Sequence, residues 1–158
     1  MGMSGLYIAL EEPVLRQVIE DEIDLHDIDP SEGDNLDIDK TWQAIYFILC
    51  GEMGVGEPPL GYVVPMLDDQ MLSFGEMGSF YVLPDQVAEA AAAIASLKEE
   101  DVRSLYRFED MVASEIYPIV SDENEQEFFD YIYGHFASLQ AFYQKLSKEG
   151  KGCVFYIL

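Results

Sequence analysis

The sequence contains few basic residues. Lys and Arg together number 8 among 158 residues, against 31 Asp and Glu, which gives a formal net charge of −23. Proteins that bind DNA, RNA or anionic membranes need clustered Lys and Arg to neutralise phosphate groups. We therefore expect neither a nucleic-acid partner nor a membrane partner. The charge is compatible with solubility, with attraction of a basic partner, or with weak binding of cations.

Long apolar runs and a cysteine framework are also absent. No run approaches the ~18 apolar residues that a membrane-spanning helix needs. The first residues, Met1 to Leu6, contain no basic stretch of the kind that opens a secretion signal. The 2 cysteines, Cys50 and Cys153, each lie in an apolar stretch, which favours reduced buried thiols over a disulfide. These features predict a cytoplasmic protein.

Sequence motifs for metal, nucleotide or nucleophilic chemistry are missing as well. Asp27 and Asp29 begin a segment like a calcium loop, but Glu32 stands where that loop requires glycine and Ile38 where it requires a bidentate Glu. The glycine-rich stretch 51–61 lacks the Gly-Lys-Ser/Thr of a phosphate loop, and no Gly-x-Ser-x-Gly occurs. We expect no metal site and no cofactor, identify no catalytic residue, and do not favour an enzyme.

The apolar content supports one folded domain over residues 1–158. Hydrophobic residues make up 49% of the chain and aromatic residues 13%. Alternating or short apolar runs bounded by turn residues predict four strands, at 4–10, 62–64, 79–83 and 153–158.

Helical spacing and helix boundary residues predict the remaining elements. The expected helices begin near Pro13, Asp39, Pro84, Ser96 and Asp122. Asp39 is expected to cap its helix, and the last helix is expected to be long and to end at Gly150. The prediction is an α+β fold, in which a small sheet includes the N- and C-terminal strands and is covered by four or five helices.

The segment from Glu20 to Asp39 is rich in carboxylates and contains neither Lys nor Arg, so we expect a solvated surface loop there. Our leading hypothesis is a noncatalytic binding protein whose acidic surface contacts a basic protein, for example in an immunity-like or inhibitor role. An alternative is that the carboxylates serve solubility alone. The proposed acidic interaction surface consists of Asp21, Glu22, Asp24, Asp27, Asp29, Glu32 and Asp34.

A second hypothesis places a small-molecule site or an enzyme pocket near the start of the helix at Trp42. His135 falls on the apolar stripe of the long helix and is expected to be half-buried. Helix capping and core packing also explain why residues of these types occur near Trp42 and on the long helix, so a purely structural role remains open. The candidate ligand-binding residues are Tyr7, Asp39, Lys40, Trp42, Tyr117 and His135.

Several segments, in this order and spacing, resemble the bacterial YfbM-like family, a domain of unknown function (1877). The segments are Met1 to Gly5 with Tyr7, Leu36 to Trp42, Phe47 to Gly51, Pro59-Leu60, Ile116 to Pro118, and the aromatic pattern from Phe136 to Tyr143. The resemblance covers nearly the whole chain. It implies a compact α+β cytoplasmic protein and no established reaction.

Overall fold

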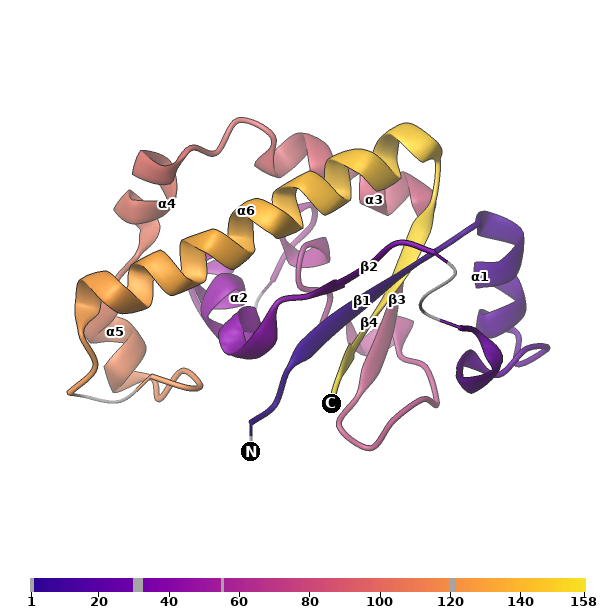
Figure 1. Cartoon of the computed structure of the whole chain (residues 1–158), viewed down its shortest axis with the longest axis horizontal. Coiled ribbons are helices and arrows are strands. Elements are labelled where there is room, and N and C mark those ends of the chain that lie inside the picture. The colour runs from indigo at the N-terminus through magenta and orange to yellow at the C-terminus, as the bar shows by residue number, and fades with distance from the viewer. Residues whose placement is uncertain (1, 30–32, 55, 120–121) are drawn as a thin grey trace.

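The structure, a computed structural model, describes residues 2–29, 33–54, 56–119 and 122–158 (Figure 1). Its sheet contains four strands: β1 (Gly5–Leu10), β2 (Asn35–Asp37), β3 (Ser79–Val82) and β4 (Gly152–Ile157). Their order is β2-β1-β4-β3, and every neighbouring pair is antiparallel. The two terminal strands therefore form the centre of the sheet, which confirms that both belong to it.

Helices make up most of the remaining structure. In the part of the chain that the structure describes there are six α-helices: α1 (Glu12–Ile19), α2 (Trp42–Cys50), α3 (Pro84–Ile94), α4 (Glu99–Leu105), α5 (Phe108–Ala113) and α6 (Glu125–Glu149). The α+β prediction is confirmed, with more helices than expected. Figure 1 shows α6 running across the sheet, and α1 at the end where β1 finishes.

The two faces of the sheet are covered unequally. Side chains alternate along β1, so Tyr7 and Ala9 belong to one apolar cluster while Ile8 and Leu10 belong to another. The larger cluster contains the buried residues of α2, α3 and α6. The smaller cluster, on the second face, is covered by α1 and by the chain that follows it. Residues 21–29, which follow α1, thus form part of the thinner cover.

The expectation of a surface loop over residues 20–39 is wrong in part. Leu25–Asp27 form a 3-10 turn, and Asn35–Asp37 form β2, in which Leu36 pairs with Tyr7. Apolar residues interrupt the run of carboxylates: Leu25 is buried in the smaller cluster, and Ile23 and Ile28 pack against it. These side chains hold the segment on the sheet while the carboxylates face solvent.

The strand expected at 62–64 is also wrong. Leu60–Tyr62 form a 3-10 turn, because the amides of Tyr62 and Val63 bond to carbonyls only three residues earlier. Val63 and Val64 are buried. The apolar run at 62–64 therefore reflects burial in the core and not pairing with another strand.

Two helix starts lie slightly later than expected. α4 begins after Lys98, whose amide donates to Asp101, and not after Ser96. α6 begins after Asn124, whose side chain accepts from the amide of Glu127, so Asp122 is not the cap. The expected helix ends at Gly51 and Gly150 are confirmed, and both glycines have the left-handed φ that favours glycine.

A pair of buried tyrosines joins three parts of the fold. The hydroxyl of Tyr7 on β1 donates to the carbonyl of Val63 at 2.6 Å. The hydroxyl of Tyr143 on α6 lies 3.0 Å from the same carbonyl and 2.7 Å from the carbonyl of Tyr62. Both side chains are fully buried. The turn at 60–63 is therefore fixed to the central strand and to the longest helix at one point.

We predict that Tyr7→Phe and Tyr143→Phe destabilise the fold cooperatively. Each single variant leaves the Val63 carbonyl with one hydrogen-bond donor in place of two. Each should lower the free energy of unfolding by about 1 kcal/mol. The double variant leaves that carbonyl without a phenol donor and should cost more than the sum of the two. Urea unfolding of all four proteins measures this, and strictly additive losses would contradict a shared acceptor.

The same tyrosines predict loss of stability at alkaline pH. Burial raises the pKa of both Tyr7 and Tyr143 well above the usual value of 10.0. Their folded-state pKa lies above the unfolded one, so their stabilising contribution is complete below about pH 10 and falls as pH rises further. Unfolding by urea at several pH values, followed with tyrosinate absorbance, should show this decline. The double Phe variant should show a flatter dependence on pH.

Candidate functional site

The carboxylates that follow α1 point into solvent at one end of the sheet. Asp21, Glu22, Asp24, Asp27 and Asp29 are all exposed. Glu32, also expected on this surface, lies outside the described residues. The five exposed carboxylates occupy the stretch whose apolar residues cover the second face of the sheet. We call this stretch, residues 21–29, the acidic segment.

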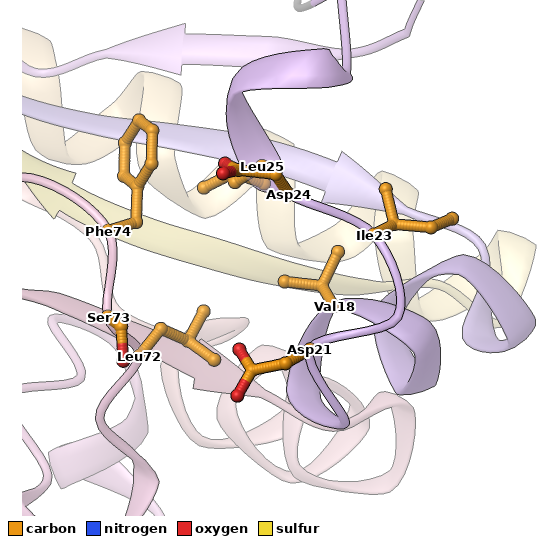
Figure 2. Close-up of a pocket in the computed structure, with 8 residues that line it drawn as sticks. All are labelled: Val18, Asp21, Ile23, Asp24, Leu25, Leu72, Ser73 and Phe74. Carbon is orange, nitrogen blue, oxygen red and sulfur yellow. The ribbon is translucent and has the colours of Figure 1, made fainter.

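A hollow of about 260 Å³ lies between the acidic segment and the loop that precedes β3. Figure 2 shows Leu72, Ser73 and Phe74 on one side of this space and the acidic segment on the other, with the carboxylate of Asp21 directed toward Leu72. The hollow is lined by Val18, Asp21, Ile23, Asp24, Leu25, Leu72, Ser73 and Phe74. Five of its eight lining residues are apolar, and its two charged members are carboxylates.

The charge at this hollow is stabilised locally. Asp24 accepts from the backbone amide of His26 at 2.9 Å, and its carboxylate lies 2.8 Å from the imidazole Nδ1. The backbone hydrogen bond, followed by the contact with the imidazole, lowers the pKa of the Asp24 carboxyl. The His26 ring packs against Phe74 with ring centres 4.6 Å apart. Asp24 therefore keeps its negative charge at pH values below those at which an ordinary aspartate is protonated.

A second hollow, of about 470 Å³, lies on the other side of the acidic segment. Ile23 lines both hollows. The second lining combines six apolar residues with three carboxylates and one lysine: Ile8, Ala9, Leu10, Val14, Ile23 and Ile28, then Glu11, Asp27, Asp29 and Lys151, with Gly33 completing it. Both sides of the segment thus present apolar surface beside negative charge.

Asp34 differs from the other members of the predicted acidic surface. Its carboxylate lies 2.7 Å from the Lys145 ammonium and 4.0 Å from that of Lys151, and only 31% of its side chain is exposed. The bond to Lys145 lowers the pKa of Asp34. Asp34 joins the end of α6 to the chain before β2, and its charge is largely compensated.

The structure brings most of the second set of predicted residues to one corner. The indole of Trp42 donates to the carbonyl of Met3 at 2.8 Å, and the hydroxyl of Tyr117 accepts from the Met3 amide at 2.7 Å. The Trp42 and Tyr117 rings lie 6.2 Å apart. These aromatic side chains hold the chain entering β1. Tyr7 lies apart from this group, in the buried core beside Val63.

The sequence predicted that Asp39 caps α2, and this prediction is wrong. The residue before the helix is Thr41, and the Asp39 carboxylate instead accepts from the hydroxyl of Tyr131 at 2.6 Å. Asp37 accepts from the Asp39 amide at 2.7 Å, and Asp39 has a φ of 51°. This left-handed conformation, which aspartate tolerates better than most residues, turns its carboxylate toward α6.

Lys40 and His135 lie at the same corner. His135 is half-buried, as expected, and packs edge-on against Tyr131 with ring centres 5.3 Å apart. Lys40 is half-buried too, and its stem lies beside Gly2, as does the Tyr117 hydroxyl. In the described part of the chain, neither of the two hollows beside the acidic segment is lined by Lys40, Tyr117 or His135. The hydrogen bonds of Trp42 and Tyr117 hold the N-terminal chain at this corner.

Three further features bear on other kinds of site: clusters of metal-ligating side chains, helices that could span a membrane, and thiols. Among the described residues, no cluster of three or more His, Cys, Asp or Glu side chains could hold a metal ion. No described helix is both long enough and apolar enough to cross a membrane. Cys153 is buried and Cys50 is half-buried, and both are free thiols. Burial raises the pKa of the Cys50 thiol to about 11 and that of Cys153 to about 12, so neither is an activated nucleophile.

Sequence reasoning missed several residues of these two regions. Tyr131 follows Phe128 by three residues and precedes His135 by four, so helical spacing could have placed it beside that histidine. Ile23 and Leu25 could have been found from their alternation with carboxylates. Leu72 and Phe74 come from a distant loop, and no local pattern connects them with the acidic segment.

We predict that Tyr131→Phe lowers stability by about 1.5 to 3 kcal/mol, because it removes the hydrogen bond to the partly buried carboxylate of Asp39. Tyr133→Phe is the matched control on the same helix, since none of the described contacts includes a hydrogen bond from Tyr133, and it should cost less than about 0.5 kcal/mol. Urea unfolding at neutral pH compares the two. Equal losses would mean that the Tyr131 hydroxyl does not clamp Asp39.

Comparison with known proteins confirms the resemblance predicted from the sequence. A family model described as a domain of unknown function (DUF1877) matches residues 1–156. The chain is similar to the crystal structure of YfbM, a protein of unknown function from Escherichia coli, with a TM-score of 0.75 and 21% sequence identity over 98% of this chain and 99% of that chain. At this identity the likeness shows a shared fold alone. No curated protein matches the chain. Because the family model spans nearly all of the sequence, the chain belongs to the DUF1877 family.

Proposed function

We propose that this protein is a noncatalytic binding protein whose acidic segment contacts a basic partner protein. The observation that carries the proposal is the hollow of Figure 2, in which the Asp21 and Asp24 carboxylates border apolar side chains. Protein interfaces combine apolar contact area with charges that select and orient the partner. An immunity-like or inhibitor role in the cytoplasm is one concrete form of this function.

Charge distribution further supports the proposal. The acidic segment contains no Lys or Arg. Lys145 forms an ion pair with Asp34 and Lys151 forms one with Glu11, and both of these carboxylates lie outside the segment. A net charge of −23 creates a field that attracts cationic surfaces and accelerates their encounter with the protein. A basic protein would therefore be steered toward this end of the sheet at low salt.

Solubility alone accounts less well for the arrangement. Carboxylates that serve only solvation need no apolar hollow beside them, whereas here apolar side chains line the space on both sides of the segment. The corner at Trp42 is a weaker alternative as a ligand site. The indole and the phenols of Tyr117 and Tyr131 are already hydrogen-bonded within the protein.

We predict that Asp21→Asn/Asp24→Asn weakens capture of basic proteins about 10-fold, because two charge pairs of about 0.5–1 kcal/mol each are lost. Asparagine at residue 24 can still accept from the His26 amide, so the turn should persist. The control Glu100→Gln/Glu109→Gln removes the same charge from exposed residues of α4 and α5 and should leave capture unchanged.

Affinity capture from a bacterial lysate at about 0.05 M and 0.5 M NaCl, quantified by mass spectrometry, tests the proposal. The supporting result is a set of basic proteins that the wild type and the control retain at low salt and that the Asp21→Asn/Asp24→Asn variant loses. Absence of any retained protein at low salt would contradict the proposal, as would equal retention by the two double variants.

A further inference from the structure

We infer that the partner recognised by the acidic segment presents an amphipathic basic segment, with Lys or Arg stems in the two hollows and an apolar side chain against Ile23. This inference rests on the proposed function and specifies the chemistry of its partner. It predicts that apolar contact, in addition to charge, holds the complex together.

The first hollow has the composition that a long cationic side chain requires. Lys and Arg bury their methylene stems along apolar surface while the charged group stays in water. Here the stem would contact Val18 and Leu72, and the cation would lie at the rim formed by Asp21 and Asp24. The Phe74 ring already contacts His26 and Tyr156, with ring centres 4.6 and 5.2 Å away, so it acts as a wall of the hollow.

The second hollow repeats this combination. Its apolar lining comes from β1, from Val14 of α1 and from Ile28, and its carboxylates are Glu11, Asp27 and Asp29. Lys151 also lines it but lies 3.8 Å from Glu11 and 3.2 Å from Glu149, so its charge is shared with carboxylates. The hollow keeps a negative balance and can accept a second cation.

Ile23 connects the two hollows, because its side chain lines both. The residue is partly exposed, and the neighbouring carboxylates Glu22 and Asp24 leave it as an apolar point within a charged surface. A partner that carried charge alone would leave this point and both apolar linings uncovered. A peptide segment with Lys or Arg on either side of an apolar residue covers all three.

Small cations fit the surface less well than such a segment. A divalent metal ion needs several oxygen ligands converging on one point, and no cluster of three or more such side chains occurs among the described residues. A polyamine supplies charge and methylene groups but no side chain for Ile23. Competition with spermine distinguishes this source of cationic groups from a protein segment.

Two fluorescent peptides of equal net charge test the inference with the full chain. One is an oligolysine, and the other contains the same number of lysines alternating with leucines. Fluorescence anisotropy gives the Kd of each at about 0.05 M and 0.5 M NaCl. We expect the lysine–leucine peptide to bind at least about 10-fold more tightly than oligolysine at the higher salt, because apolar contact is not screened.

Ile23→Ser isolates the apolar contact. It should weaken the lysine–leucine peptide about 10-fold and leave oligolysine within about 2-fold. The control Leu105→Ser removes an exposed apolar side chain from α4, where Leu105 is 41% exposed, and should change neither peptide. Thermal unfolding confirms that each variant is folded. If Ile23→Ser does not fold, Ser73→Lys, which adds a cation at an exposed residue of the first hollow, should weaken both peptides.

The outcomes separate the two proposals. Equal affinity of both peptides at the higher salt, or full competition of spermine for the lysine–leucine peptide at the same charge concentration, would overturn the amphipathic partner and leave the acidic interface standing. Absence of binding by either peptide at the lower salt would contradict the proposed function itself. Peptide binding that Asp21→Asn/Asp24→Asn does not weaken would overturn both.

Discussion

The Val63 carbonyl, buried at the centre of the larger cluster, is the point on which the rest of the fold depends. It accepts from Tyr7 in the central strand and from Tyr143 in the longest helix. A buried carbonyl without a donor would destabilise the core, whereas two phenol donors fix the turn, the sheet and α6 relative to one another. The same contact explains why an apolar run that resembles a strand forms a 3-10 turn instead, because Val63 is held by side chains and not by a neighbouring strand.

Unequal covering of the sheet then decides where a binding surface can form. On one face, α2, α3 and α6 bury the larger cluster. On the other, a single short helix and the acidic segment cover the smaller cluster, so apolar residues remain near the surface. The hollows on both sides of Ile23 follow from this thin cover. The candidate interface is therefore a consequence of the architecture as well as of the charge.

Much of the fold follows from local sequence patterns, and much of the candidate site does not. The alternation at β1, the apolar run at β4 and the glycine ends at Gly51 and Gly150 are local signals, and the structure confirms these elements. The strand β2 was missed because Leu36 is a single apolar residue between Asn35 and Asp37, and the pairing of β2 with β1 depends on contacts distant in sequence. Asp39 looked like a helix cap, but its left-handed backbone and the remote Tyr131 direct its carboxylate elsewhere. Local patterns identified the acidic segment, yet only the fold shows which loop faces it.

Buried or half-buried residues alternate with exposed ones in the acidic segment, so selection for folding and selection for binding act on different residues. Substitution of Leu25 disturbs packing on the sheet, whereas substitution of the exposed Glu22 or Asp27 changes only what faces solvent. Mutations can therefore accumulate on the outer side of the segment at almost no cost in folding, while the buried side stays constrained. A surface with this property can follow changes in a partner over evolutionary time and acquire new specificities on an unchanged scaffold.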